Sequence, residues 1–143
     1  FSGVGNFALP IATSGAKVLA IEGDEMLVDS GNKNAIENNL SKNLNFKKID
    51  LFNINKQELV KLGQANKWLI DPPRVGAKDL INLLDGKIKP ELIIYISCNP
   101  ASLARDSNIL VNEKDYIFRK GGIVNMFPHT SHIESIALFE RNE

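Results

Sequence analysis

The chain has 143 residues, of which 43% are hydrophobic and 24% charged, which is the length and make-up of one globular domain with its own core. Its 17 basic residues balance 17 acidic ones, so no overall positive field attracts a polyanion, and nucleic acid would need a local patch or another domain. Because there is only 1 cysteine, an internal disulfide and a multi-thiolate metal site are excluded. No apolar run is long enough to cross a membrane, and we expect a cytoplasmic protein with no membrane contact.

Short β-branched runs alternate with helical stretches, which is typical of helices packed around a mostly parallel sheet. Four apolar runs end in a polar residue, as buried parallel strands do, and predict strands at 18–22, 46–50, 68–71 and 92–97. The helical stretches predict helices at 6–14, 24–40, 56–62, 78–84 and 102–111, the last capped by Ser102. The β-rich segments 116–127 and 131–140 have no helix between them and should form an antiparallel final pair.

The chain opens at Phe1 directly into a glycine turn, with no strand in front of it. In an open α/β sheet the first strand is usually central, and losing its buried side chains would cost roughly 1.5–3 kcal/mol each. We therefore expect residues 1–143 to be one N-terminally truncated catalytic domain of a longer protein. A sheet that lacks an inner strand exposes an apolar slot, which favours a homodimer of the isolated chain.

Polar groups and glycines at the start of the chain predict a nucleotide site. Gly3 and Gly5 stand where a strand would turn into a helix, so the backbone can approach a ligand. The same spacing fits a loose dinucleotide fingerprint, or a tight turn with no ligand. Glu22 ends a strand and is interpreted as a bidentate acceptor for ribose hydroxyls, with a helix cap as the alternative. Asp50 ends the next strand and is either an acceptor for an adenine amino group or a solvated strand end.

Residues 71–74 read Asp-Pro-Pro-Arg and directly follow an apolar strand. Two successive prolines stiffen the turn and would hold Asp71 in place. We predict that Asp71, Pro72 and Arg74 contact the acceptor base or its phosphate, and that Asp71 also borders the cofactor. The alternatives are a proline-terminated strand with Asp71 as a cap, and an ion pair between Arg74 and Asp71.

Cys98 follows the strongest predicted strand at the sheet edge where ligand sites form, and it precedes Asn99. An inert buried thiol is the alternative fate of a lone cysteine. A thiolate can add to the electrophilic carbon 6 of a uracil, after which carbon 5 can attack the methyl group of a sulfonium donor.

Such an addition requires a base that later removes the proton from carbon 5. Glu134, in a polar turn near the last strand, is the candidate. His129 and His132 are rivals for this role and could instead cap turns. The two histidines and the acid could also form a metal site, but no helical spacing supports one, and we predict no metal.

Two long segments, 97–106 and 125–135, resemble the RNA (uracil-5-)-methyltransferases. They read Ser-Cys-Asn-Pro-Ala-Ser-Leu-Ala-Arg-Asp and Asn-Met-Phe-Pro-His-Thr-Ser-His-Ile-Glu-Ser. The segments 3–10, 18–23 and 71–76 look like the same family's catalytic domain in the same order. The resemblance is closer to the 23S ribosomal RNA enzymes than to the transfer RNA enzyme.

The resemblance implies a Rossmann-like fold, S-adenosylmethionine as the methyl donor, and ribosomal RNA as the substrate. It also implies that Cys98 is the nucleophile, that Glu134 is the base, and that Asn99 belongs to the substrate pocket. Asn125 departs from the family, which usually carries an aspartate there. The chain also lacks the family's upstream RNA-binding β-barrel and, in the ribosomal branch, an iron–sulfur cluster domain.

Three other functions remain open at this point. An amino-group methyltransferase acting on adenine or guanine would use the Asp71 turn and give Cys98 no role. A nicotinamide-dependent enzyme would use the glycine turn and Glu22, and would leave the Pro-Pro turn unexplained. A non-catalytic nucleotide-binding module would use neither Cys98 nor Glu134.

Overall fold

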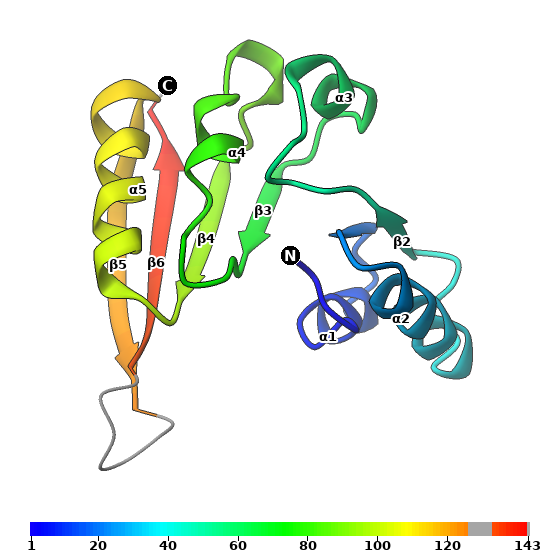
Figure 1. Ribbon diagram of the computed structural model, residues 1–143. Coiled ribbons are helices and arrows are strands. Elements are labelled where there is room, and N and C mark those ends of the chain that lie inside the picture. The colour runs from blue at the N-terminus through cyan, green and yellow to red at the C-terminus, as the bar shows by residue number, and fades with distance from the viewer. Residues whose placement is uncertain (126–132, 143) are drawn as a thin grey trace. The chain divides into compact units, whose positions relative to one another are not determined.

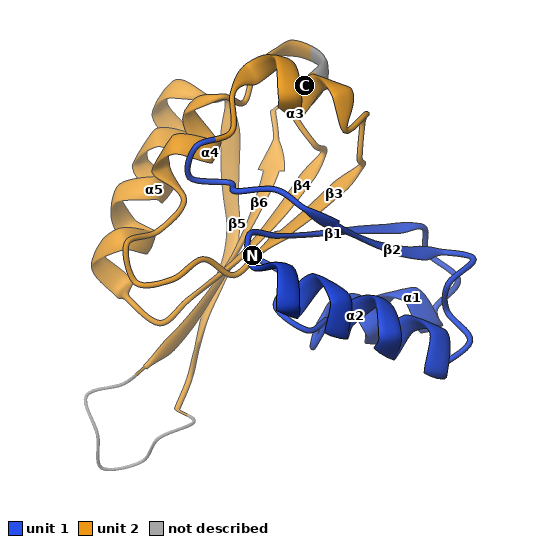
Figure 2. Cartoon of the chain, turned by 45° about the vertical axis from the view of Figure 1, so that its right-hand side comes forward, with its two compact units in different colours: residues 1–53 blue, residues 54–143 orange. Residues whose placement is uncertain are grey.

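The structure, a computed structural model, describes residues 1–125 and 133–142. The chain divides into two compact units, Phe1–Asn53 and Ile54–Glu143 (Figure 2). Both units contain strands and helices (Figure 1). Within the described ranges, no helix combines the length and the apolar character needed to traverse a bilayer.

The first unit is a two-stranded parallel sheet with two helices. In chain order its elements are α1 (Ala8–Thr13), β1 (Val18–Glu22), α2 (Glu25–Glu37) and β2 (Leu44–Lys48). The pairing of β1 with β2 runs from Val18 opposite Leu44 to Glu22 opposite Lys48. Both helices contact the strands, and Phe46 and Val28 belong to the buried cluster between them.

The second unit is a four-stranded sheet with the order β3-β4-β6-β5. Its elements are α3 (Lys56–Lys61), β3 (Lys67–Ile70), α4 (Lys78–Asn82), a 3-10 turn (Gly86–Ile88), β4 (Leu92–Ser97), α5 (Pro100–Glu113), β5 (Tyr116–Val124) and β6 (Glu134–Arg141). β3 is parallel to β4, whereas β6 is antiparallel to both β4 and β5. Helix α5 contacts β4, β5 and β6 and covers one face of this sheet (Figure 1).

The strand predictions are confirmed in type, and two of them also in their bounds. β1 and β4 begin and end where the apolar runs predict, and the final pair is antiparallel. The second strand was predicted two residues too late, because buried Leu44 begins the pairing with β1. In β2 buried residues alternate with exposed Asn45 and Lys47, so this strand is not the fully buried run that was expected.

The predicted bounds of the two long helices need correction. α2 ends at Glu37, because Asn39 adopts a left-handed φ of 59° that no helix continues. α5 begins at Pro100, and its cap is Asn99, whose side chain accepts a hydrogen bond from the Ala101 amide at 3.2 Å. Ser102 is not the cap.

The first residues of the chain lie along β1. The amino group of Phe1 and the amide of Ser2 both donate to the Ile21 carbonyl, at 2.7 and 3.0 Å. The next carbonyl of β1, that of Glu22, accepts instead from Ile49 at 2.8 Å on the β2 side. Residues 1–2 therefore occupy the edge of β1 that β2 does not use, and a strand before residue 1 stays a prediction.

Candidate active site

Glu22 holds the glycine turn of the first unit in place. Its carboxylate accepts hydrogen bonds from the amides of Gly3 at 2.8 Å, Gly23 at 2.7 Å and Asp24 at 3.2 Å. Burial raises the pKa of Glu22, but these three backbone donors together outweigh it and keep the pKa below its ordinary value. A carboxylate has about four lone-pair positions, so an ionised Glu22 can still accept from a ligand hydroxyl.

The two glycines of the turn are required for different reasons. Gly5 has a φ of 101°, and a Cβ there would lie 2.7 Å from the Phe46 ring. Gly3 has a φ of 52°, and nothing lies within 4 Å of the position of its missing Cβ. Gly5 therefore fits the turn against β2, whereas Gly3 faces open space that a ligand can enter.

Two acids near the ends of β1 and β2 act within their own loops. Asp24, and not Glu22, caps α2, because its side chain accepts from the amides of Met26 and Leu27. Asp50 accepts from the Phe52 amide at 2.9 Å and from the Asn53 side chain at 2.6 Å. These two bonds hold the pKa of Asp50 below its ordinary value. Asp50 is thus ordered and ionised, and its contact with a cofactor stays a prediction.

In the second unit, a hydrogen-bonded turn at the end of β4 carries Cys98. The buried Ser97 hydroxyl accepts from the Asn99 amide at 3.0 Å and donates to the Asn99 carbonyl at 2.9 Å. The same carbonyl accepts from Ser102 Oγ at 2.9 Å. Cys98 is a free, partly exposed thiol, so the reading as a sealed, inert cysteine is not supported.

The register of the sheet brings Cys98 and Glu134 to corresponding positions. Ser97 of β4 is the partner of Ser135 of β6. Glu134 is the first residue of β6, and Cys98 lies in the bend that directly follows β4, so both residues lie next to this pair at the same end of the two strands. Glu134 is partly exposed, as a group that reaches a substrate must be.

Asp71 lies next to the same place, at the end of β3. Ile70 pairs with Tyr95, so one further residue along the parallel register sets Asp71 beside Ile96. Burial and the negative charge of Glu134 both raise the pKa of Asp71. The two carboxylates are therefore close enough for their charges to interact.

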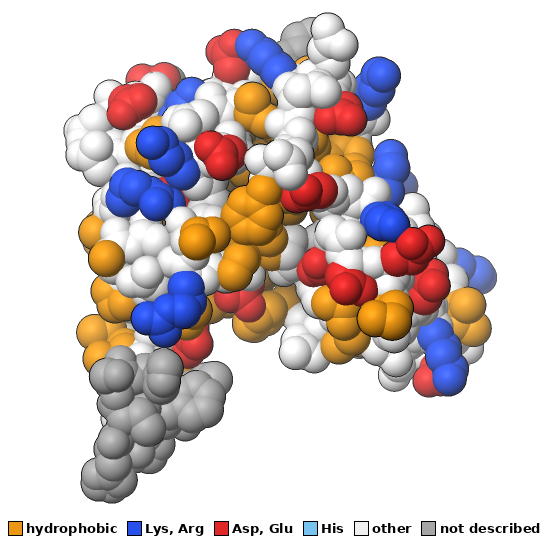
Figure 3. Space-filling model, in the orientation of Figure 1, with side chains coloured by type: hydrophobic (Ala, Val, Ile, Leu, Met, Phe, Trp, Pro, Cys, Tyr) orange, Lys and Arg blue, Asp and Glu red, His pale blue; other side chains and the backbone are white. Residues whose placement is uncertain are grey.

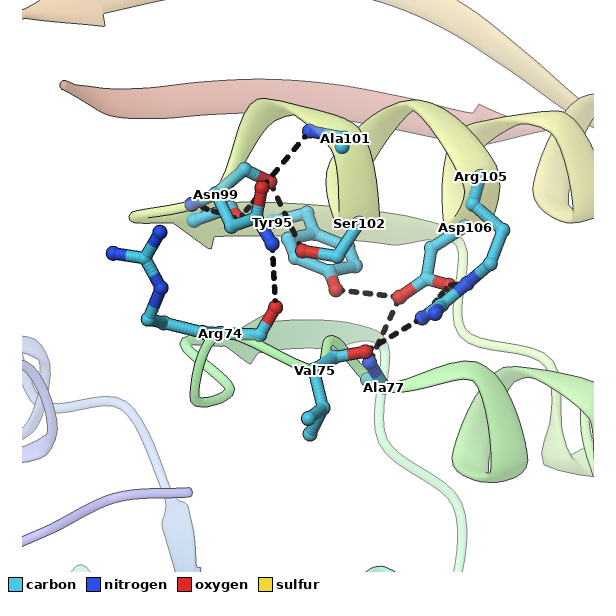
Figure 4. A network of polar contacts seen from close by, with 10 residues as sticks. Arg74, Val75, Ala77, Tyr95, Asn99, Ala101, Ser102, Arg105 and Asp106 are labelled. Carbon is cyan, nitrogen blue, oxygen red and sulfur yellow. Dashed lines mark hydrogen bonds and ion pairs between the residues drawn. The ribbon is translucent and has the colours of Figure 1, made fainter. Parts of the chain in front are cut away.

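The other residues of the Asp-Pro-Pro-Arg loop differ in exposure. Pro72 is buried, so it stiffens the loop, and its contact with a substrate stays a prediction. Arg74 is exposed and makes no ion pair with any residue in the described ranges, so the alternative of an Asp71–Arg74 pair is wrong. Its side chain points away from the polar network drawn in Figure 4 and is available to an anion.

The network in Figure 4 joins this loop to α5, and no motif in the sequence predicts it. The Asn99 side chain donates to the Arg74 carbonyl at 2.8 Å while it caps α5. Asp106 accepts from the Ala77 amide at 2.8 Å and from Tyr95 at 2.6 Å. The two bonds of the Asn99 amide use one of its N–H groups and one oxygen lone pair, so its second N–H is left for another acceptor, and its contact with a substrate stays a prediction.

Several predicted participants lie outside the described residues. His129 and His132 are among them, so their rivalry with Glu134 is not tested. Asn125 is the last described residue before the gap, and it is exposed. Within the ranges 1–125 and 133–142, no three His, Cys, Asp or Glu side chains are grouped as metal ligands.

Residues 1–142 match the family described as tRNA (Uracil-5-)-methyltransferase. The chain belongs to this family. It is 52% identical over 142 residues to the 23S rRNA (uracil(1939)-C(5))-methyltransferase of Aromatoleum aromaticum, covering 99% of this chain and 33% of that enzyme. The corresponding enzyme of Dechloromonas aromatica is 51% identical over 98% of this chain and 32% of its own length. The chain thus spans about one third of these relatives.

Solved structures agree with the family assignment and establish the fold as a Rossmann-like methyltransferase fold. The tRNA (uracil-54, C5)-methyltransferase of Pyrococcus abyssi, solved with S-adenosyl-L-homocysteine, has a TM-score of 0.80 and 30% sequence identity. The match covers 96% of this chain and 32% of that one. A putative RNA methyltransferase of Pyrococcus horikoshii has a TM-score of 0.74 at 17% identity over 99% of this chain and 72% of its own, which supports the fold alone.

Proposed function

We propose that the full-length protein transfers a methyl group from S-adenosylmethionine to carbon 5 of a uracil in RNA, and that the RNA is 23S ribosomal RNA. The observation that carries this proposal is the pairing of Ser97 with Ser135, which puts a partly exposed Cys98 and Glu134 at the same end of β4 and β6. The 23S specificity of the relatives named above supports the choice of RNA. We also propose that the two units belong to one methyltransferase domain.

In the proposed reaction, the thiolate of Cys98 forms a bond from Sγ to carbon 6 of the uracil, after its own proton has gone to solvent. The electron pair displaced from the ring double bond makes carbon 5 nucleophilic. Carbon 5 takes the methyl group while the bond from the methyl carbon to the positively charged sulfur breaks, and S-adenosylhomocysteine leaves with that electron pair. Glu134 then accepts the proton from carbon 5, the double bond to carbon 6 re-forms, and the Cys98 thiolate leaves. Atoms and charges balance without a metal or a redox step.

The first unit carries the residues proposed to hold the donor, which when bound supplies a methyl group on a positively charged sulfur. The fit rests on Glu22, which stays ionised with spare lone pairs, and on Gly3, which faces open space. We assign Glu22 to the ribose hydroxyls, Gly3 and Gly5 to the approach of the backbone, and Asp50 to the adenine. Asp71 and the exposed Arg74 of the second unit would orient the base and its phosphate.

RNA binding by this part of the protein would be local. On the face of residues 54–143 that Figure 3 shows, basic and acidic side chains are interspersed, in line with the balance of 17 basic and 17 acidic residues. Most of the phosphate contacts are therefore assigned to parts of the longer protein. A cytoplasmic location follows from a ribosomal substrate, and a homodimer of the isolated chain is testable by sedimentation.

The proposal is tested by methylation of protein-free 23S ribosomal RNA with the full-length protein and its Cys98→Ala variant. Wild-type protein should incorporate methyl groups at uracil carbon 5, and the variant should incorporate none above background. Normal turnover by Cys98→Ala would eliminate the covalent mechanism and favour transfer to an exocyclic amine, which needs no thiolate. Mapping of the modified base distinguishes the two products.

A further inference from the structure

The buried carboxylate of Asp106 is the centre of the network that joins α5 to the Asp-Pro-Pro-Arg loop. Asp106 is 0% exposed and lies in the middle of α5. Its Oδ2 accepts from the Ala77 amide and from Tyr95, while its Oδ1 accepts from Arg105 Nε at 2.8 Å. A buried charge that is paired and hydrogen-bonded on both oxygens is costly to disturb, because each partner would lose a bond it cannot replace with water.

Three backbone groups of the loop are tied to residues that follow Cys98. The Arg74 carbonyl accepts from Asn99, the Val75 carbonyl accepts from Arg105 Nη2 at 2.8 Å, and the Ala77 amide donates to Asp106. Figure 4 shows these contacts converging from the loop and from α5. The loop that carries Asp71 and the turn that carries Cys98 are therefore held to each other by a polar clamp, here defined as Asn99, Arg105 and Asp106.

Gly76 shows how closely the loop approaches this clamp. It has a φ of 82°, and a Cβ there would lie 2.6 Å from both Arg105 Nη2 and Asp106 Oδ2. The backbone at this point thus packs directly on the two charged groups, with no room for a side chain between them.

The clamp lies on the face of the sheet opposite Ile96 and Glu134. Tyr95 points to the α5 side, where it meets Asp106, so its neighbour Ile96 belongs to the other face, and so does Glu134, which precedes Ser135, the partner of Ser97. Asp106 is fully buried and cannot touch a substrate on that face. Any effect of Asp106 on the chemistry must therefore act through the loop.

We infer that Asp106, with Arg105, is a positioning residue for methyl transfer: its carboxylate fixes residues 75–77 and so sets the place of Asp71 and Arg74 relative to Cys98. This inference rests on the proposed function. Reactions between held partners are sensitive to position, and a displacement of about 1 Å can cost about a hundredfold in rate. The clamp accordingly controls how fast Cys98 meets the uracil, more than how tightly RNA or donor binds.

The test uses the full-length protein with Asp106→Asn and, as a second variant, Arg105→Lys. Asparagine keeps the shape but has one acceptor oxygen, so its NH2 group must face either Ala77 and Tyr95 or Arg105, and one side of the network is lost. Lysine keeps the positive charge, but its single amino group cannot reproduce the separate bonds that Arg105 Nε makes to Asp106 and Arg105 Nη2 makes to the Val75 carbonyl. The matched control is Tyr116→Phe, which also removes a buried hydrogen bond, from Tyr116 to the Pro90 carbonyl at 2.7 Å, elsewhere in the same unit.

The readout is the covalent adduct with 23S RNA that contains 5-fluorouracil, since a fluorine at carbon 5 leaves no proton for the base to remove and the adduct accumulates. The final amount of adduct, the amplitude, measures how many protein molecules have a competent site. The rate constant of adduct formation measures the reactivity of each such site. We expect both clamp variants to react at least about tenfold more slowly per competent site, with KM for RNA within about twofold of wild type. Tyr116→Phe should lower the melting temperature and leave the rate per competent site unchanged.

A loss of amplitude with an unchanged rate in the clamp variants would overturn the inference, because the clamp would then serve folding alone. Arg105→Lys decides the matter if Asp106→Asn does not fold. Absence of any adduct with the wild-type protein would instead contradict the proposed function, so the two failures are distinguishable.

Discussion

Ser97 and Ser135 are register partners on β4 and β6, and this pairing places Cys98 and Glu134 at the same end of the two strands. A nucleophile and a base on neighbouring strands can act on adjacent atoms of one pyrimidine ring.

Glu134→Gln should let the Cys98 adduct form and block its release, because an amide cannot take the proton from carbon 5. Turnover should fall by about 10²–10⁴-fold, while acid-quenched samples accumulate protein bound covalently to RNA. Denaturing gel electrophoresis with labelled 23S RNA measures the adduct, and Glu140→Gln on the same strand is the control. If Glu134→Gln turns over normally, another base acts, and His129 and His132 become the candidates.

Glu22→Gln should weaken the binding of S-adenosylhomocysteine by about tenfold or more. The amide has one acceptor oxygen, so it cannot receive the Gly3 amide and the Gly23 and Asp24 amides on separate oxygens as the carboxylate does. Titration calorimetry on the full-length protein measures the change. Glu37→Gln, an exposed substitution on α2, should bind as wild type does.

The same calorimetry separates the methyl donor from the nicotinamide alternative. We expect the full-length protein to bind S-adenosylhomocysteine and to give no heat with NAD under identical conditions, because the family match covers residues 1–142. Binding of NAD alone would instead favour the dinucleotide interpretation of the glycine turn.

Asp71→Asn should raise the melting temperature at pH 7 by a few degrees. Burial and Glu134 raise the pKa of Asp71 in the folded protein above its ordinary value of 3.8, so folding is favoured when this carboxyl is protonated and loses that contribution as the pH rises through the raised pKa. The gain should therefore shrink as the pH falls through the ordinary value of 3.8, because wild-type Asp71 then becomes increasingly neutral in both states.

Thermal melts of wild type and variant at pH 3.5 and pH 7 measure this dependence. Asp85→Asn is a control of opposite sign, because the ion pair with Lys56 lowers the pKa of Asp85 and its removal gives no gain at pH 7. Equal gains for Asp71→Asn at both pH values would contradict the assigned cause.

Gly76→Ala should cost about 3 kcal/mol of unfolding free energy, and Gly63→Ala only about 1 kcal/mol. Both glycines have a similar positive φ, 82° for Gly76 and 85° for Gly63, so both variants carry the backbone strain. Only Gly76 faces close neighbours, whereas nothing lies within 4 Å of the Cβ position at Gly63. Denaturant unfolding measures both free energies. Equal costs would show that the loop around Gly76 shifts easily to make room for the added methyl group.

The sequence predicts the structure correctly where one local signal decides it. The apolar runs of β1 and β4 set their own bounds, and the absence of a helical pattern between the last two segments fixed their antiparallel pairing. The cap of α5 is visible in the sequence, because an asparagine directly before a proline is a strong helix-start signal. The prediction of Ser102 as the cap is therefore wrong for a reason that the sequence itself shows.

The polar clamp could not be predicted from the sequence, for a physical reason. A carboxylate in the middle of an amphipathic helix looks the same in sequence whether it faces water or the core, and the partners of Asp106 are 11 and 29 residues away. Only the fold shows that Tyr95 and Ala77 converge on it. The alignment of Cys98 with Glu134 likewise depends on register, which the sequence of either strand does not determine alone.

The two hydrogen bonds of the Asn99 side chain limit which residues can replace it in evolution. Its oxygen caps α5 and its nitrogen holds the Arg74 carbonyl, so a short side chain with both an acceptor and a donor is needed. Aspartate would preserve the helix start and release the loop, serine would offer a single hydroxyl for both tasks, and glutamine would overshoot the Ala101 amide. We expect the neighbour of the reactive sulfur to be as restricted in identity as the sulfur itself, without taking part in any bond change.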